Sequence, residues 1–260
     1  MRLVTWNVNS VKQRLPRLLA LLDRHDPDVV CLQETKVLDE DFPFDEIERS
    51  GYRSLSFGQR AYNGVAILAR DEPVELARGF TGDPLPEACR ILAADVAGVH
   101  VVSVYAVNGK ALDNPAYETK LAWFDAFTAW VRDRFDPSEP LVLAGDFNVA
   151  PEDRDVHDPE RWRGKIHASE PERARIAALM QLGLSDLGRQ AAGDVPGPFT
   201  WWDYRMGAFH RGWGLRIDLA LATDSVAGSL ASVEVDREER KPTAGEGKPS
   251  DHAPVVVTWA

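Results

Sequence analysis

Residues 2–34, "RLVTWNVNSVKQRLPRLLALLDRHDPDVVCLQE", contain the pattern that decides the fold class. Residues 2–8 alternate between polar and apolar side chains and are rich in β-branched and aromatic residues, which is typical of a strand. Residues 28–34 are a short apolar run that predicts a second, buried strand. The stretch between them predicts a helix, so the segment is expected to form a β-α-β unit. Both of its strands end in polar residues, Asn7 and Glu34.

The helix within this unit is predicted from the spacing of its leucines. Leu15, Leu18, Leu19 and Leu22 fall at positions i, i+3, i+4 and i+7, which lie on one helical face. Pro16 stands near the start, where a helix tolerates proline. We therefore expect the four leucines to form the buried stripe of this helix and to carry no function.

The rest of the chain continues with alternating strand and helix patterns. Strands are predicted at 63–70, 90–96, 99–107, 140–148, 214–222, 230–236 and 254–260, and helices at 114–135 and 169–184. The second of these helices begins with a capping box, Ser169 to Glu172. This order indicates an α/β fold in which two sheets pack together with helices on the outside.

Composition limits the class of protein. The chain has 260 residues, of which 44% are hydrophobic and 27% charged, as in globular proteins. No apolar run approaches the roughly 20 residues that span a membrane, and the N-terminus lacks a signal-peptide pattern. Two cysteines form no disulfide framework, so a cytoplasmic location without membrane contact is expected.

The charge is distributed unevenly. The net charge is −11, which argues against a broad basic surface that coats nucleic acid. Much of the acid is local, in residues 39–48, whereas basic residues gather in residues 161–165 and 204–216. A nucleic-acid substrate therefore remains compatible with the sequence.

Polar residues stand at the ends of several apolar strands. They are Asn7, Glu34, Tyr105, Asp146, Asn148, Asp218, Asp251 and His252. Each alone is explained by an ordinary solvated strand end, but a carboxylate within a buried run costs several kcal/mol unless it is paired or bound to a metal. Oxygen ligands with one histidine and no cysteine fit a hard cation such as Mg²⁺ or Mn²⁺. The set as a whole therefore predicts a metal-dependent phosphoesterase.

The motifs that contain these residues resemble one known family. "TWNVN", "LQETK", "YAVNG", "GDFN", "WWDYR", "LRIDLAL" and "SDHAPV" occur in the order seen in exonuclease III-type apurinic/apyrimidinic endonucleases of the endonuclease–exonuclease–phosphatase superfamily. The resemblance extends from Leu3 to Trp259. It implies a single domain over residues 1–260, with a four-layered α/β sandwich of two packed mixed β-sheets flanked by helices.

The resemblance also implies a metal site. Glu34 is expected to be the main Mg²⁺ ligand, with Mn²⁺ as a possible substitute, and Asn7 and Asp251 are expected to assist it. The same resemblance adds three further residues to the metal-binding set: Asp146, Asn148 and His252.

Catalytic roles follow from the same resemblance. Asp146 is expected to prepare or orient the attacking water, while Asn148 and Tyr105 hold the scissile phosphate. His252, paired with Asp218, is expected to act on the phosphate as a base or as a charge stabiliser. The sequence leaves open whether Asp146 or His252 takes the proton.

Five further residues are expected to handle DNA by resemblance. Arg90 matches an arginine that reaches a phosphate, and Asn108 matches an amide that contacts the backbone. Trp201 and Trp202 match an aromatic loop beside an extruded abasic sugar. Lys120 stands where the family often has a lysine near the site.

The predicted function is that of a Mg²⁺-dependent DNA-repair nuclease. It would cut duplex DNA at abasic sites and trim 3′ ends as a 3′–5′ exonuclease and 3′-phosphatase, and we expect a monomer. The superfamily core also permits RNA or a phosphoinositide or phospholipid headgroup as substrate. A non-catalytic binding module would be expected to lack at least one of the metal or phosphate residues, and none is missing.

Overall fold

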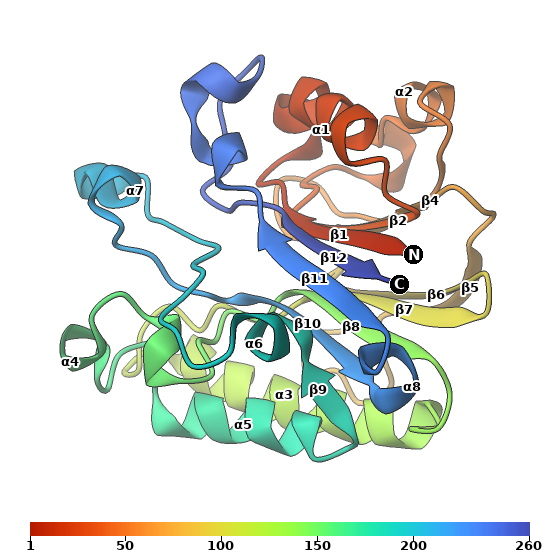
Figure 1. The fold of residues 1–260 in the computed structure, drawn as a ribbon. Helices are drawn as coiled ribbons and strands as arrows, with labels where there is room; N and C mark the ends of the chain where they lie inside the picture. Colours follow the sequence, from red (N-terminus) through yellow and green to blue (C-terminus); the bar gives the residue numbers. More distant parts are fainter.

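The architecture is a pair of stacked six-stranded β-sheets, as a computed structural model of residues 1–260 shows (Figure 1). The first sheet has the spatial order β11 (Leu230–Val235), β12 (Val255–Trp259), β1 (Arg2–Asn7), β2 (Val29–Gln33), β4 (Val65–Ala69) and β3 (Arg53–Phe57). The second has the order β5 (Val74–Arg78), β6 (Ile91–Val96), β7 (Val99–Tyr105), β8 (Leu141–Asp146), β10 (Asp218–Thr223) and β9 (Leu184–Asp186).

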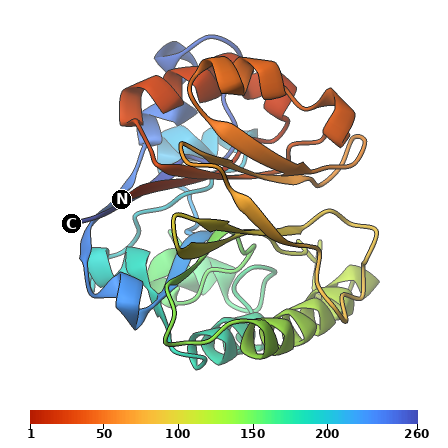
Figure 2. The same cartoon turned by 90° about the vertical axis from the view of Figure 1, so that its right-hand side faces the viewer.

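Helices cover the outer faces of both sheets, which gives the four layers seen in Figure 2. The α-helices are α1 (Val11–His25), α2 (Phe44–Arg49), α3 (Pro115–Arg134), α4 (Pro159–Trp162), α5 (Glu170–Met180), α6 (Leu187–Ala192), α7 (Ala208–Arg211) and α8 (Asp224–Ala227). Short 3-10 turns are η1 (Asp39–Asp41), η2 (Asp153–Asp155), η3 (Arg205–Gly207), η4 (Arg237–Arg240) and η5 (Pro242–Ala244). No helix combines the length and apolar character needed to cross a membrane.

Three hydrophobic cores separate these layers. One lies between the sheets and includes Cys31, Ile67 and Ala144. A second packs α1 and α2 on the first sheet, and a third packs the aromatic face of α3 on the second sheet. Each strand that contributes to two cores buries both of its faces, which explains why β2, β4 and β8 read as continuous apolar runs.

The predicted β-α-β unit is confirmed, but the buried face of its helix differs from the expected one. Leu18 and Leu22 are buried, whereas Leu15 and Leu19 are only half-buried. The positions rotated toward the core include two arginines, Arg14 and Arg17, because both guanidinium groups bind backbone carbonyls of residues 239–249. The leucine pattern could not indicate those long-range partners.

Strand pairing brings the polar strand ends to one edge. In the first sheet β1 and β2 are parallel, with Asn7 opposite Gln33. In the second sheet β7 and β8 are parallel with Tyr105 opposite Asp146, and the antiparallel β10 places Asp218 opposite Asp146. The antiparallel β12 begins at the same edge as the end of β1. The strands β1, β7 and β8 therefore contribute their C-terminal ends to one site, whereas the antiparallel strands β10 and β12 contribute their N-terminal ends.

The predicted strands differ from the observed strands mainly where the strands are short. The strand predicted at 214–222 begins only at Asp218, because Leu215 instead bridges the loop at Trp201. No sequence pattern predicted β3, β5 and β9, which are edge strands of the two sheets. Of these, β3 and β5 are only partly buried. The capping box at the start of α5 is present.

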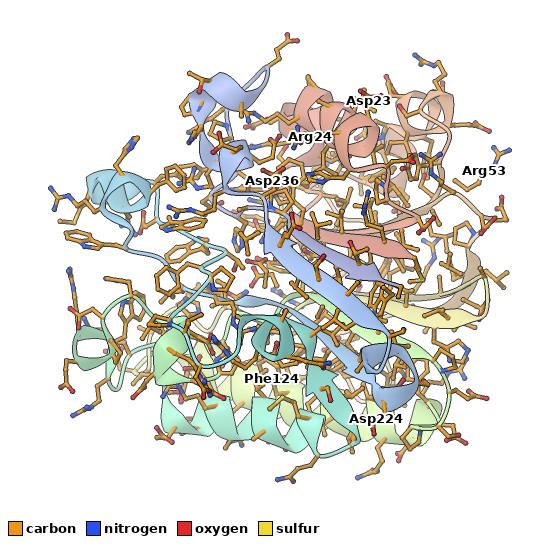
Figure 3. The ribbon with its side chains drawn as sticks, in the orientation of Figure 1. Asp23, Arg24, Arg53, Phe124, Asp224 and Asp236 are labelled. Carbon is orange, nitrogen blue, oxygen red and sulfur yellow. The ribbon has the colours of Figure 1, made fainter.

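An ion-pair cluster connects the end of α1 to the segment after β11. Arg24 and His25 lie 2.6 and 2.8 Å from Asp236. Figure 3 labels Arg24 and Asp236. Burial would raise the pKa of Asp236, but the hydrogen bonds from His25 and Arg24 outweigh it and lower that pKa to about 2. The folded pKa is thus below the unfolded one, so the stabilisation is present above about pH 4 and is lost as the pH falls toward 2.

We therefore expect Asp236→Asn to lower the free energy of unfolding by about 1–2 kcal/mol at pH 7 and by much less at pH 2.5. Urea unfolding at both pH values measures this. Asp23→Asn, an exposed carboxylate on the same helix (Figure 3), is the matched control and should change neither value. Equal stability of Asp236→Asn and the parent protein at pH 7 would contradict the assignment.

Candidate active site

The predicted catalytic residues converge on one edge of the two sheets. Asn7 ends β1, and its amide nitrogen donates to Glu34 Oε1 and to Asp146 Oδ2, both at 2.9 Å. The Tyr105 hydroxyl donates to the same Glu34 oxygen at 3.0 Å. One amide thus joins carboxylates from the two different sheets. This contact links the edges of the two sheets at the site.

Glu34 has a left-handed backbone conformation that only a few residue types favour. Its φ is 52°, and Lys36 two residues later also has a positive φ of 57°. The Lys36 ammonium lies 2.6 Å from Glu34 Oε2. Burial would raise the pKa of Glu34, but Lys36 and the Asn7 amide outweigh it and lower the pKa. Glu34 is therefore an ionised carboxylate that already attracts a cation.

His252 is held by two carboxylates. Its Nδ1 lies 2.9 Å from Asp218 Oδ2, and its Nε2 lies 3.7 Å from Asp146 Oδ2. Burial would lower the pKa of His252, but Asp218 and Asp146 outweigh it and raise the pKa to about 10. The imidazole is therefore a buried cation at neutral pH, with Nδ1 donating to Asp218 and Nε2 facing Asp146.

Asp146 is more basic than an ordinary aspartate. Burial raises its pKa, and the nearby Asp218 and Glu34 add to this, whereas His252 opposes it. Its Oδ1 accepts the Asn148 backbone N–H at 2.9 Å. A carboxylate with a raised pKa is suited to accept a proton from a water molecule.

Asp251 and Asn148 are fixed by their neighbours. Asp251 accepts from Asn9 Nδ2 at 2.9 Å and from Trp201 Nε1 at 3.1 Å. Burial would raise the pKa of Asp251, but His252 and these two hydrogen bonds outweigh it and lower that pKa. Asn148 donates to the Ala106 carbonyl at 3.0 Å and has a φ of 54°.

The donor set fits a hard divalent cation on the Glu34 side of the site. Glu34 and Asp251 are ionised carboxylates that flank residues 7–9, and Glu34 is paired with the Lys36 ammonium. A second cluster, Asp146, Asp218 and His252, has ligand atoms within 4.8 Å of one another. This cluster could also hold a metal ion, and it contains Asp146 and His252, two residues that the sequence analysis placed in the metal-binding set.

Three of the five predicted DNA contacts lie at the rim of this site. The Arg90 guanidinium lies over the Tyr105 ring, 4.8 Å from its centroid. Asn108 is exposed and donates from Nδ2 to Asn148 Oδ1 at 3.0 Å. Trp201 lies with its ring 6.5 Å from that of His252.

The other two predictions, Lys120 and Trp202, are wrong as direct DNA contacts because both side chains are buried. The Lys120 ammonium donates to the Asn148 carbonyl at 2.7 Å and pairs with Glu172. Burial lowers the pKa of Lys120, and Glu172 opposes this. Trp202 packs in a small core with Ala208 and Ala253. Lys120 therefore positions Asn148 from beneath the site.

Several site residues were missed in the sequence analysis. Asn9 binds both Asp251 and Lys36, and the buried Arg14 joins the Asn9 carbonyl to the Tyr204 hydroxyl. His167 is buried beside Trp201, with its Nδ1 2.6 Å from the Asn148 carbonyl. Asn9 and Lys36 stand within the motifs "TWNVN" and "LQETK", so those motifs were the available signal. No local pattern distinguishes Arg14 or His167.

Comparison with known proteins assigns the chain to a family. The Endonuclease/Exonuclease/phosphatase family matches residues 4–252. Exodeoxyribonuclease III of Haemophilus influenzae is 33% identical, and the alignment covers 100% of this chain and 99% of that protein.

Solved structures with the same fold include a Neisseria meningitidis 3′–5′ exonuclease, NExo, at 43% identity and a TM-score of 0.94. The Neisseria 3′ phosphatase NExo, bound to a product DNA hairpin, is 42% identical with a TM-score of 0.95. An AP endonuclease from Archaeoglobus fulgidus is 34% identical with a TM-score of 0.94. Each alignment covers 100% of this chain and 99% of the other. The chain therefore belongs to the Endonuclease/Exonuclease/phosphatase family.

Proposed function

We propose that this protein is a Mg²⁺-dependent DNA-repair nuclease that hydrolyses phosphate esters at the 3′ ends of duplex DNA and at abasic sites. The observation that carries the proposal is the convergence of Glu34, Asp146 and His252 at one edge, in a chain that resembles DNA-repair nucleases from end to end. The two carboxylates and the histidine meet the needs of phosphodiester hydrolysis, which are a proton acceptor for water and positive charge for the phosphate.

The residue roles follow from the protonation states. Asp146 is proposed to accept the proton of the attacking water, because burial raises its pKa, whereas Asp218 and Asp146 favour the protonated form of His252. The His252 cation stabilises the negative charge that develops on the phosphate, and Asp218 holds the ring in place. Tyr105 and Asn148 complete the phosphate side of the site. We therefore propose Asp146 rather than His252 as the base.

The metal ion is proposed to be Mg²⁺. Glu34, Asn7 and Asp251 would hold it, since carboxylate and amide oxygens are ligands that Mg²⁺ prefers, and Mn²⁺ would substitute. A divalent ion bound there would supply positive charge to a phosphate oxygen and to a water molecule. We further propose a monomer, because the amphipathic faces of α1, α3 and α5 are already packed on the sheets.

We propose that 3′ ends are the principal substrate. The Neisseria proteins named as a 3′–5′ exonuclease and a 3′ phosphatase are 43% and 42% identical to this chain, against 34% for the AP endonuclease. These sequence identities favour hydrolysis at 3′ ends. Cleavage at abasic sites stays part of the proposal.

Three labelled duplexes test the function in one experiment. One carries a 3′-phosphate, one a recessed 3′-hydroxyl and one an internal abasic analogue, and each is incubated with Mg²⁺ or with EDTA. We expect Mg²⁺-dependent turnover, fastest on a 3′ end. Intact 3′ ends in the presence of Mg²⁺ would refute the proposal.

RNA or a phosphoinositide remains the alternative that the shared fold permits. The DNA hairpin bound to the Neisseria relative favours DNA. A single-stranded RNA and a phosphoinositide should be assayed beside the DNA duplexes. If either one is turned over faster than the duplexes, it is the substrate in place of DNA.

A further inference from the structure

Arg14 is a buried cation in the first turn of α1, and the helix itself does not explain it. Arg14 is 3% exposed, and all of its hydrogen-bond acceptors are neutral, whereas Arg17 on the next turn pairs with Glu239. Its Nε is buried without a hydrogen-bond partner. Burying a charge is costly, and a cation near a helix N-terminus opposes the helix dipole. The contacts of the guanidinium must therefore account for this position.

Acceptors from three separate parts of the chain surround the Arg14 guanidinium. Its Nη1 donates to the Asn9 carbonyl at 2.6 Å and to Gln13 Oε1 at 2.8 Å. Its Nη2 donates to the Tyr204 hydroxyl at 2.9 Å and to the Pro249 carbonyl at 3.1 Å. The Tyr204 hydroxyl in turn donates to the Pro249 carbonyl at 2.8 Å. Because hydrogen bonds from a charged donor are stronger than neutral ones, Arg14 holds the Asn9 carbonyl in a fixed position.

The backbone turn at Asn9 needs support of this kind. Asn9 has a φ of 46° and Ser10 a φ of 91°, so two consecutive residues other than glycine are left-handed. Such conformations persist only where the surrounding structure holds them. The Ser10 N–H donates to the Glu34 carbonyl at 2.7 Å, and Arg14 binds the Asn9 carbonyl. These two contacts hold the turn in its observed form.

The side chain of Asn9 connects the carboxylates that are proposed to hold the metal ion. Its Nδ2 donates to Asp251 Oδ1 at 2.9 Å, and its Oδ1 accepts from the Lys36 ammonium at 2.6 Å. Lys36 also pairs with Glu34. The Asn9 backbone N–H donates to Asn7 Oδ1 at 3.0 Å. The orientation of Asn9 is therefore linked to every residue of the proposed metal site.

We propose that Arg14 is a positioning residue for the divalent metal ion. Arg14 holds the Asn9 carbonyl, so that the Asn9 side chain orients Asp251 and the Lys36–Glu34 pair for metal binding. It acts through Asn9 and not as a ligand, because a guanidinium repels a metal cation. Residues that orient metal ligands typically change metal affinity by about 10–100-fold. The inference rests on the metal site proposed above and adds a residue on which the affinity of that site depends.

Direct metal binding to Arg14→Lys provides the test. Lysine keeps the positive charge but lacks the planar fork that reaches several acceptors at once. Mn²⁺ is titrated into the full chain without DNA, and the free ion is measured by electron paramagnetic resonance. We expect Arg14→Lys to weaken Mn²⁺ binding by about tenfold or more. In cleavage of a 3′-phosphate duplex, the same variant should need more Mg²⁺ but recover most of the parent rate when Mg²⁺ is saturating.

Arg17→Lys is the matched control. Arg17 is also buried on α1 and also binds backbone carbonyls, those of residues 239–247, but its contacts do not include Asn9. Both substitutions should lower the thermal unfolding temperature, whereas Arg17→Lys should keep the Mn²⁺ affinity of the parent protein. Equal Mn²⁺ affinity of Arg14→Lys and the parent protein, or an equal loss in Arg14→Lys and Arg17→Lys, would overturn the inference.

A double variant tests the route through Asn9. Asn9→Gly tolerates the left-handed turn but removes the side chain that binds Asp251. Adding Arg14→Lys to Asn9→Gly should cause little further loss of Mn²⁺ affinity, because residues that act through one contact are not additive. A further loss as large as that of Arg14→Lys alone would show that Arg14 acts by another route, and it would overturn the inference.

Tyr204→Phe is the second variant if Arg14→Lys does not fold. It keeps the ring but removes the hydroxyl that accepts from Arg14 and donates to the Pro249 carbonyl. We expect a smaller loss of Mn²⁺ affinity, about threefold, because the other acceptors of Arg14 remain. An unchanged affinity in this variant would count against the role of Arg14.

The positioning role and the proposed function fail in different ways. If the parent protein binds no Mn²⁺, the proposed metal site is refuted, and the role of Arg14 is refuted with it. If the parent protein binds Mn²⁺ and cleaves DNA but Arg14→Lys binds the ion equally well, the proposed function stands and only the role of Arg14 fails.

Discussion

Glu34→Gln is expected to reduce Mg²⁺-dependent cleavage by about a thousandfold or more. The substitution keeps the shape of the side chain and its contact with Asn7 but removes the charge that would hold the cation. A divalent ion supplies several kcal/mol to phosphoryl transfer, and each 1.36 kcal/mol is a factor of ten in rate. Steady-state kinetics on a 3′-phosphate duplex measures the loss.

Metal binding can be measured without following catalysis. Thermal unfolding of the parent protein should shift upward as Mg²⁺ or Mn²⁺ is added, because a ligand that binds only the folded state stabilises it. Glu34→Gln should lose this shift while keeping its secondary structure. Glu40→Gln, an exposed glutamate in η1, is the control for both measurements and should resemble the parent protein. A Glu34→Gln protein with full activity would refute the metal site.

Asp218→Asn is expected to reduce kcat/KM on the order of a hundredfold at pH 8, within the usual range for losing one contact that stabilises transition-state charge. Asp218 lies 2.9 Å from His252 Nδ1 and is the strongest of the groups that raise the pKa of His252 to about 10. Without that charge, burial lowers the pKa of His252 toward or below its ordinary value of about 6.5. The cation would then be lost as the pH rises through that value, so the defect should shrink near pH 6.

The pH dependence separates this role from simple loss of structure. A kcat/KM profile from pH 6 to 9 should show a new fall in activity with rising pH in Asp218→Asn, and NMR titration of His252 should follow the same curve. Asp224→Asn, at the other end of β10 and exposed, should leave both unchanged. A uniform loss at every pH, with His252 still protonated at pH 9, would contradict the mechanism.

The sequence determined much of the fold because periodicity is a local property. The strands around Val30, Leu68 and Leu143 are buried on both faces, so their apolar runs are continuous and visible. Edge strands such as β3 and β5 bury only part of their residues and have no such run. The same limit explains α1, where Arg14 and Arg17 replace leucines on the buried face because of carbonyl partners more than two hundred residues away.

The sequence also determined which residue types meet at the active site, since Asn7, Glu34, Asp146, Asp218 and His252 stand at strand ends within recognisable motifs. Only the tertiary structure decided the charges, the burial and the contacts that surround each of these residues. The contacts with Asp218 and Asp146 raise the pKa of His252, burial raises the pKa of Asp146, and Lys120 is buried in an ion pair with Glu172. Protonation and exposure depend on charges and burial contributed by distant segments, and no local pattern contains that information.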